Sequence, residues 1–408
     1  MKIALLHYTS HPIVGGVESV LAHHARLMSK SGHDITILAG RGESFDERIP
    51  VHILPRLDSR QHEVMRVKAL LDKGKYTPAF DALRDQIKED LLAEVKNCDV
   101  LIAHNVASLH KNLPLTAAIR ESYELPEFPR LILWHHDLAW TTPRYRHEMH
   151  AGYPWDLLRS RWEGVVHVAV SEFRRQELSD LLGVPKESIR LIKNGVDLNT
   201  FFKLEPQTIH LMEQLKLIQA NPLFLLPVRL TPRKNIELAL HVLAELRIGF
   251  PNAVLLVTGP EGPHNPTNAV YKQKLLDLRS ELNLRDAVHF LAVVTSGFIP
   301  DSVIADFYRL ADALLFPSRE EGFGIPLIEA AISSMPVFCA NIPVLHELGG
   351  EDVSYFDLNA TPYSIAGMIA DRLRSEATSR WSRRVKHSYS WDAIYISCIA
   401  PLLQEVNT

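Results

Sequence analysis

Short apolar segments alternate with amphipathic segments along the whole of this chain, and that alternation constrains its fold more than any other feature. Residues 3–8 form a short apolar run, as expected of a strand buried in a parallel sheet. Residues 17–30 carry apolar side chains at helical spacing, Gly32 ends that pattern, and residues 35–38 form the next apolar run. Strand, helix and strand in this order predict a βαβ unit with two parallel strands.

The same alternation occurs in both halves of the chain, which predicts two domains. Further strands are expected at residues 100–103, 131–134, 165–170, 189–193, 223–228, 253–258, 288–291, 313–316, 337–339 and 353–356. Helices are expected within residues 60–97 and at residues 172–182, 234–248, 271–282, 302–310, 325–333 and 362–375. A chain of 408 residues exceeds the usual size of one core. We predict the α/β class, with Rossmann-like, doubly wound domains at residues 1–195 and 196–385 and a helical tail at residues 386–408.

The composition argues against several classes of protein. The formal net charge is −4, whereas a nucleic-acid-binding domain normally carries a basic excess. The three cysteines are far apart, which implies neither a disulfide framework nor a zinc site and fits a reducing cytoplasm. No run approaches the ~18 apolar residues of a membrane span, and the apolar start of the chain is too short for a signal peptide. We expect a cytoplasmic protein that binds no nucleic acid.

The most specific motif lies at residues 316–330. A predicted strand ends there, a loop with two glycines follows, and a helix begins. The N-terminus of a helix presents unpaired amide groups and a partial positive charge. We expect the backbone amides of Phe323, Gly324 and Ile325 to point at an anion.

Two carboxylates belong to the same motif. Glu321 lies in the loop, and Glu329 lies about one turn into the predicted helix. An anion site would repel both carboxylates unless they bind something else. Hydroxyl groups of a sugar or ribose are suitable partners, because carboxylates accept strong hydrogen bonds. The alternative is a plain helix start with acidic residues favoured by the helix dipole.

A second charged loop follows the first strand of the second domain, at residues 228–235. Arg229 and Lys234 lie five residues apart in this loop, just before a predicted helix. A guanidinium and an ammonium group there would neutralise a diphosphate leaving group. The alternative is surface charge on an exposed loop.

Two shorter motifs follow strands of the first domain. Gly15 and Gly16 come after the first strand, where they allow close approach to a phosphate or form a plain tight turn. His135 and His136 end another predicted strand. Because adjacent side chains on a strand point apart, a metal site is not expected, and one of the two histidines would face a ligand and donate a hydrogen bond to it.

The first domain carries the least specific signals. Residues 139–155 are rich in aromatic and arginine side chains, and Arg144 with Tyr145 suits a sugar, carboxylate or phosphate on an acceptor. A solvent-exposed loop explains the same composition. Asn105 follows a strand end and is expected to line the same pocket. Basic and apolar residues at positions 60–75 leave a membrane-surface patch open, although neighbouring acidic residues dilute it.

Together these segments resemble the retaining family 4 glycosyltransferases, which have the GT-B fold, and the resemblance covers nearly the whole chain. Glu321 and Glu329 resemble the E-x7-E signature of that family, and Arg229 with Lys234 resembles its diphosphate-binding pair. Supporting matches are Gly15-Gly16, His136-Asp137, residues 169–172 and residues 193–197. Two positions depart from the family pattern, since Val228 and Asn235 stand where glycines are usual.

The resemblance implies that two domains face each other across a cleft and that the second binds a nucleotide-diphosphate sugar. Arg229 and Lys234 would hold the diphosphate, Glu329 the ribose and Glu321 the donor sugar. Other residues implied to contact the donor are His136, Gly15, Gly16, Gly259, Phe323, Gly324 and Ile325. Residues 258–261 and a strand end at residues 291–294 would flank the base. The tail at residues 386–408 would cross back to the first domain.

The implied reaction is hexose transfer that retains the anomeric configuration and needs neither a metal nor another cofactor. We expect UDP-glucose first and GDP-mannose second as the donor. The first domain would bind the acceptor, expected to be small, soluble and hydroxyl-bearing, with a lipid or polysaccharide as the alternative. The rival functions are an epimerase or phosphorylase on the same two-domain plan, a dinucleotide-dependent oxidoreductase and a non-catalytic sugar-nucleotide-binding protein. The oxidoreductase is disfavoured because the chain lacks a G-x-G-x-x-G motif.

Overall fold

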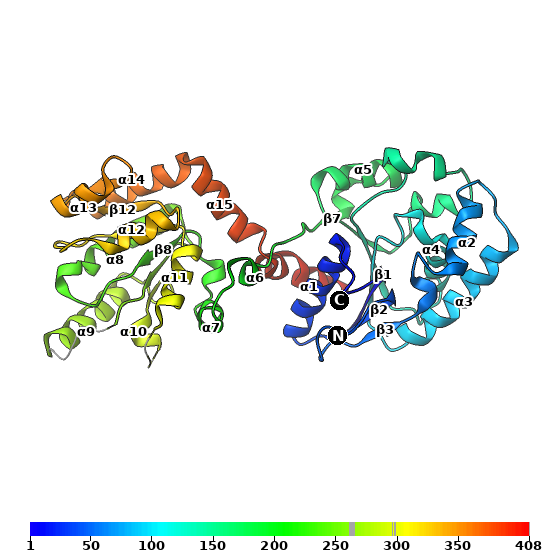
Figure 1. Ribbon diagram of the computed structural model, residues 1–408, viewed down its shortest axis with the longest axis horizontal. Coiled ribbons are helices and arrows are strands. Elements are labelled where there is room, and N and C mark those ends of the chain that lie inside the picture. Colours follow the sequence, from blue (N-terminus) through cyan, green and yellow to red (C-terminus); the bar gives the residue numbers. More distant parts are fainter. Residues whose placement is uncertain (261–265, 296, 298, 408) are drawn as a thin grey trace. The chain divides into compact units, whose positions relative to one another are not determined.

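The chain forms two compact units in the computed structural model, which describes residues 1–260, 266–295, 297 and 299–407. Unit 1 consists of Met1–Gly195 and Ile394–Thr408, and unit 2 consists of Val196–Ala393. Each unit contains one parallel sheet surrounded by helices (Figure 1). The predicted fold class, with two Rossmann-like sheets, is therefore confirmed.

Unit 1 is built on a seven-stranded sheet in the order β3-β2-β1-β4-β5-β6-β7. Its strands are β1 (Lys2–Thr9), β2 (Asp34–Arg41), β3 (Val51–Ile53), β4 (Val100–His104), β5 (Arg130–His135), β6 (Val166–Ala169) and β7 (Ile189–Leu191). From β1 the strand order first runs to β2 and β3 on one side of β1. The chain then returns and adds β4 on the other side of β1. In such sheets ligands bind beyond the carboxyl ends of the strands at this reversal.

The helices of unit 1 cover a sheet whose central strands are buried on both faces. Within residues 1–195 they are α1 (Gly16–Lys30), α2 (His62–Leu71), α3 (Pro78–Val95), α4 (Leu113–Ser122) and α5 (Glu172–Leu182). All of β1 except its first residue is buried, which explains its unbroken apolar sequence. The α5 helix begins where Ser171 accepts a hydrogen bond from the Arg174 amide and ends at Gly183, which has a φ of 63°.

Unit 2 repeats the same plan with six strands in the order β10-β9-β8-β11-β12-β13. Its strands are β8 (Leu223–Leu226), β9 (Val254–Val257), β10 (Val288–Phe290), β11 (Ala313–Phe316), β12 (Val337–Ala340) and β13 (Ser354–Phe356). The reversal of strand order falls between β8 and β11, so both charged motifs predicted above follow the two central strands.

Helices surround this second sheet and bury one large apolar core. They are α6 (Leu198–Phe202), α7 (Pro206–Gln214), α8 (Ile236–Gly249), α9 (Pro266–Glu281), α10 (Leu291–Val294), α11 (Asp301–Leu310), α12 (Ile325–Ile332), α13 (Pro343–Gly349), α14 (Pro362–Ser375) and α15 (Ala377–Ser388). No helix in the described ranges is long and apolar enough to cross a membrane.

One predicted strand end is wrong. Residues 291–294 form the short helix α10, closed by a hydrogen bond from the Thr295 amide to the Leu291 carbonyl. The sequence Leu-Ala-Val-Val is apolar throughout, and a short apolar run does not distinguish a strand from a buried helical turn. The strand β10 stops at Phe290, where its pairing with β9 also ends.

The predicted tail at residues 386–408 is divided between the two units. Residues up to Ala393 belong to unit 2, because Lys386 pairs with Asp312 and the Trp391 amide bonds to the Val196 carbonyl. From Ile394 the chain belongs to unit 1. From Trp391 the tail is helical without a break and consists of α16 (Trp391–Ile394), a π-helical turn at Tyr395–Ile399 and α17 (Ala400–Asn407).

Candidate functional site

The loop after β8 places two predicted cations in different surroundings. The Arg229 side chain is exposed and, among the residues that the structure describes, has no ion-pair or hydrogen-bond partner. Lys234 ends a short 3-10 turn that begins at Pro232, and its side chain is nearly buried. Arg229 is thus exposed to solvent, whereas Lys234 is held by the protein.

Asn235 follows Lys234 at a position that demands an unusual backbone. It has a φ of 51° and a ψ of 43°, the left-handed region that glycine and asparagine adopt more readily than other residues. The departure from the family glycine therefore keeps the loop geometry. The Asn235 side chain also accepts a hydrogen bond of 2.8 Å from Arg319. This bond ties the loop after β8 to the loop after β11.

Lys234 and Glu321 form a direct ion pair inside unit 2. Their Nζ and Oε1 atoms lie 2.5 Å apart, and only 10% of the lysine side chain and 8% of the glutamate side chain are exposed. The ammonium group also lies 5.5 Å from the centre of the Phe316 ring. The sequence assigned these two residues to different parts of a donor. The structure joins them into one pair that links both charged motifs.

A cavity of about 760 Å³ lies beyond the carboxyl ends of β8 and β9. Its lining includes the predicted residues Arg229, Gly259, Ile325 and Glu329, together with Thr258, Pro260 and Ala292 from the segments expected to flank the base. A cation, a close-approach glycine, the first residue of α12 and a carboxylate thus share one concave surface. Such a cavity with few convergent polar groups is typical of a small-molecule site.

Gly259 has a steric role at the edge of this cavity. A Cβ atom there would lie 2.0 Å from the Val228 carbonyl oxygen and 2.5 Å from the Arg229 nitrogen. The loops after β8 and β9 therefore touch backbone to backbone, and only glycine allows it. Glu261, which was expected nearby, lies outside the described residues.

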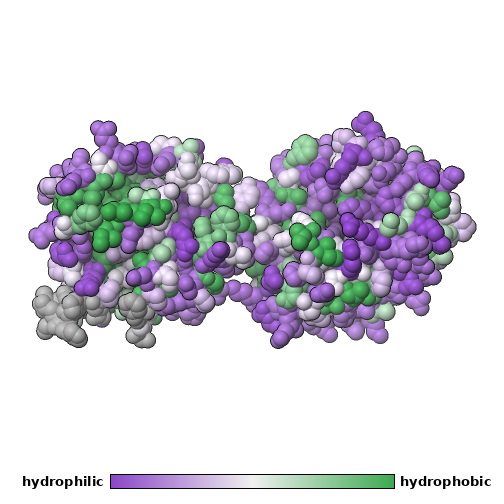
Figure 2. Space-filling model, viewed as in Figure 1, coloured by the Kyte–Doolittle hydropathy of each residue, from purple (hydrophilic) through white to green (hydrophobic). Residues whose placement is uncertain are grey.

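The glycine loop leads into α12 as predicted. Gly324 has a φ of 102°, and a Cβ there would lie 2.7 Å from the Leu345 side chain, so both conformation and space require glycine. Phe323 and Ile325 are exposed beside it. Ile328 and Ile332 continue an exposed apolar stripe along the helix, and Figure 2 shows an apolar patch over α12 and α13.

Glu329 is held by a residue that the sequence analysis missed. The Tyr308 hydroxyl donates a hydrogen bond of 2.5 Å to Glu329 Oε2. Tyr308 lies in α11, where an aromatic residue on the apolar face predicts only core packing. No local signal links it to a carboxylate that lies 21 positions further along the chain.

In unit 1, the predicted glycines stand at the start of α1. Gly15 precedes the helix with an extended backbone, and a Cβ on Gly16 would meet nothing within 4 Å. Glu18, in the first turn, accepts a hydrogen bond of 2.5 Å from the Thr9 hydroxyl. The helix start is therefore tied to the end of β1, and the backbone at Gly16 remains open to a ligand.

His136 lies in a cluster of buried imidazoles at the ends of β1, β4 and β5. His136 Nε2 is 3.2 Å from His104 Nδ1, and His7 Nδ1 is 2.8 Å from the His104 carbonyl oxygen. Burial, followed by the nearby His7, lowers the pKa of His136 to about 3. His136 is therefore a neutral imidazole near pH 7, and it can donate or accept a hydrogen bond but adds no charge.

Asn105 has a structural role beside this cluster. Its side-chain oxygen accepts hydrogen bonds from the amides of His136, at 2.7 Å, and Asp137, at 3.1 Å. Its φ is 59°, and its side chain is buried. The predicted contact between Asn105 and an acceptor stays a prediction, whereas its contacts within the protein fix the turn that carries His136.

The two other predicted acceptor residues lie together. The Arg144 guanidinium is 4.6 Å from the centre of the Tyr145 ring, and that ring packs edge-on against His110 at 4.8 Å. His110 follows the β4 loop that contains Asn105. The three residues assigned to the acceptor therefore belong to one region of unit 1.

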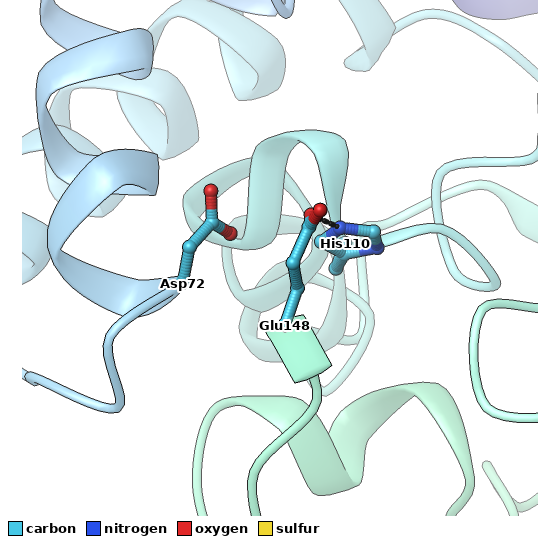
Figure 3. Close-up of side chains that lie close together, drawn as sticks. All are labelled: Asp72, His110 and Glu148. Atoms are coloured by element: carbon cyan, nitrogen blue, oxygen red, sulfur yellow. Dashed lines mark hydrogen bonds and ion pairs between the residues drawn. The ribbon is translucent and has the colours of Figure 1, made fainter. Parts of the chain in front are cut away.

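Asp72, His110 and Glu148 form a group whose ligand atoms lie within 4.8 Å of one another, the one such group found in the described part of the chain (Figure 3). His110 hydrogen-bonds to Glu148. The Lys68 ammonium lies 2.7 Å from Asp72 and 3.0 Å from Glu148. Because this lysine already supplies the positive charge, the geometry favours an ion-pair network over a metal centre.

Comparison with known proteins assigns the chain to a family. Residues 14–200 match the family described as Glycosyltransferase Family 4, and residues 209–384 match Glycosyl transferases group 1. An MMP alpha-(1->4)-mannosyltransferase of Mycolicibacterium hassiacum is 26% identical, over 98% of this chain and 97% of its own. The Mannosylglucosylglycerate synthase of Petrotoga mobilis is 25% identical, over 87% and 86%. A D-inositol 3-phosphate glycosyltransferase of Streptosporangium roseum is 24% identical, over 95% and 84%. The chain thus belongs to glycosyltransferase family 4, with two Rossmann-like units of the GT-B class, and it is a glycosyltransferase.

Proposed function

We propose that unit 2 binds a nucleotide-diphosphate hexose in the 760 Å³ cavity and that the enzyme transfers the hexose with retention of configuration. The observation that carries the proposal is the convergence of Arg229, Gly259, Ile325 and Glu329 on that one cavity. An exposed guanidinium suits a diphosphate, and a carboxylate suits ribose hydroxyls. Non-catalytic binding of the same ligand is the rival that an activity assay separates.

Mannose is our first candidate for the hexose. The composition of the cavity does not distinguish UDP-glucose from GDP-mannose, the two donors considered from the sequence. The names of two of the relatives above, a mannosyltransferase and a mannosylglucosylglycerate synthase, favour the mannosyl donor. We therefore place GDP-mannose ahead of UDP-glucose.

The chemistry we propose is a front-face displacement at the anomeric carbon. The bond from that carbon to the diphosphate oxygen breaks while the acceptor oxygen bonds on the same face, and the acceptor proton passes to the departing phosphate. Arg229 and Lys234 stabilise the charge that develops on the diphosphate. Lys234 would exchange its bond to Glu321 for one to phosphate, which releases the Glu321 carboxylate to bind sugar hydroxyls. No metal is needed in this scheme, since the two cations neutralise the leaving group.

We assign the acceptor to unit 1, near Arg144 and Tyr145, and propose a small, soluble hydroxyl compound. An exposed guanidinium stacked on an aromatic ring suits an acceptor that carries a carboxylate or phosphate. The name D-inositol 3-phosphate glycosyltransferase, borne by one relative, is in line with a small phosphorylated acceptor. A lipid or polysaccharide acceptor is the alternative.

Substitution of Lys234 tests the proposal. We expect Lys234→Ala to lower turnover by about 10²-fold or more, because one donor to the developing charge is lost. Lys274→Ala is the matched control, since Lys274 lies in the same unit, is exposed and pairs with Glu237 at 3.1 Å. Turnover would be measured with GDP-mannose and UDP-glucose, with and without EDTA, and the anomeric configuration of the product by NMR.

Removal of Lys234 also leaves the buried Glu321 carboxylate unpaired, which costs about 3–5 kcal/mol of stability. The double variant Lys234→Met with Glu321→Gln removes both charges and avoids this penalty. We expect it to unfold near the wild-type temperature and to remain inactive. Wild-type turnover in a folded Lys234 variant would refute the assignment.

A further inference from the structure

We propose that Tyr308 is a positioning residue that presets the Glu329 carboxylate for the nucleotide ribose, and so governs donor affinity rather than the rate of transfer. The inference rests on the proposed function, since it concerns the same cavity. It adds Tyr308, a residue of α11 that lies outside both charged motifs, residues 228–235 and 316–330.

The geometry gives one of the two Glu329 oxygens a hydrogen-bond donor within the protein. Oε2 accepts the hydrogen bond of 2.5 Å from the Tyr308 hydroxyl, and Glu329 lines the cavity. Tyr308 is only 3% exposed, so its hydroxyl is fixed by the packing of α11 against the sheet. Among the residues that the structure describes, only Oε2 has a hydrogen-bond partner, so Oε1 is the oxygen left to accept hydrogen bonds from a ligand.

The Tyr308 hydroxyl keeps its proton and donates a hydrogen bond in this position. Burial raises the pKa of Tyr308, and the hydrogen bond to Glu329 raises it further, so the group stays protonated at any working pH. A charge-assisted bond of this kind restricts the rotamers of a flexible glutamate. Ordering the side chain before the ligand arrives removes an entropic cost of binding, which is worth roughly three- to tenfold in affinity.

The chain offers a matched control pair. Tyr271 in α9 is 5% exposed and donates a hydrogen bond to Glu237 in α8, which is the same chemistry in the same unit. Neither Tyr271 nor Glu237 lines the cavity. A loss of nucleotide affinity common to both tyrosine variants therefore reflects lower stability. A loss of affinity confined to Tyr308→Phe reflects the change at the cavity.

The test is calorimetric titration of wild type, Tyr308→Phe and Tyr271→Phe with GDP and UDP and with their 2′,3′-dideoxy forms. For the diphosphate that the wild type binds better, we expect Tyr308→Phe to weaken binding three- to tenfold. We expect no difference between Tyr308→Phe and wild type for the dideoxy ligand, which lacks the hydroxyls that Glu329 would bind. KM for the donor should rise by the same factor with kcat nearly unchanged, and Tyr271→Phe should bind like wild type.

A double-mutant cycle keeps the inference testable if Tyr308→Phe is destabilised. In the Glu329→Ala background, Tyr308→Phe should weaken binding no further, because its effect passes through that carboxylate. The inference is overturned if Tyr308→Phe binds the ribonucleotide as tightly as wild type, or loses equal affinity for both forms. A wild-type protein that binds neither diphosphate and transfers no hexose would overturn the proposed function, and this inference with it.

Discussion

Gly259→Ala perturbs the cavity through the smallest possible change, one methyl group. The added Cβ would lie 2.0 Å from the Val228 carbonyl oxygen and 2.2 Å from its carbon. Both are backbone atoms, so no side chain can rotate away. Contacts below 3.0 Å require a shift of the neighbouring chain, here by about 1 Å. The loop after β8 must therefore move away from the loop after β9.

The cost can be worked from that geometry. Overpacking a well-filled site costs about 1–3 kcal/mol. For a unit of this size, that corresponds to a fall of roughly 2–12 °C in the midpoint of thermal unfolding. The moved segment includes Arg229, whose side chain lines the cavity. A displacement of 1 Å at a reacting site can lower turnover by about 10²-fold.

Gly297→Ala provides the control, because Gly297 lines the same cavity and an added Cβ would meet nothing within 4 Å. Thermal unfolding, nucleotide titration and transfer rate would be measured for both variants. We expect Gly259→Ala to lose stability and activity together and Gly297→Ala to keep both. If Gly259→Ala unfolds and turns over like wild type, the two loops are not in backbone contact and the steric argument fails.

Two further predictions concern stability. Burial lowers the pKa of His7 to about 4 and of His24 and His136 to about 3, so the unfolded chain takes up protons first as the pH falls below 6.5. Stability that is present above pH 6.5 is therefore lost on acidification, by about 1 kcal/mol per histidine at pH 5.5. Urea unfolding of unit 1 at pH 7.5 and at pH 5.5 would measure this loss. Equal urea midpoints at the two pH values would contradict the prediction. Asn235→Ala should be less stable than Asn235→Gly by about 1 kcal/mol, because alanine disfavours a φ of 51°, and equal unfolding free energies would refute the backbone argument.

Much of the fold could be predicted because it depends on local patterns. Apolar runs of strand length, amphipathic runs of helical length and glycine stops such as Gly183 lie within a few residues of the elements they define. The strand β3 (Val51–Ile53) was missed because three residues at a sheet edge carry no periodicity. The turn α10 was misassigned for the related reason that four apolar residues fit either structure.

The candidate site could be predicted only in part. Arg229, Lys234, Glu321 and Glu329 could be named as candidates because each follows a strand within a motif. Their pairing could not be found, since Lys234 and Glu321 lie 87 positions apart in the sequence. Tyr308 was not predicted for the same reason. No feature of the neighbouring sequence distinguishes a core tyrosine from one that donates a hydrogen bond to a carboxylate.

The sequence by itself determined the alternation of strands and helices, the two-sheet plan and the residues available at the strand ends. These follow from side-chain polarity and backbone preference, which act over a few residues. Tertiary structure alone decided which charges meet, where glycine is sterically required, and which carboxylate oxygen is left for a ligand. Those features depend on distances between residues far apart in the chain, and such distances are set only once the strands of one sheet and their loops have assembled.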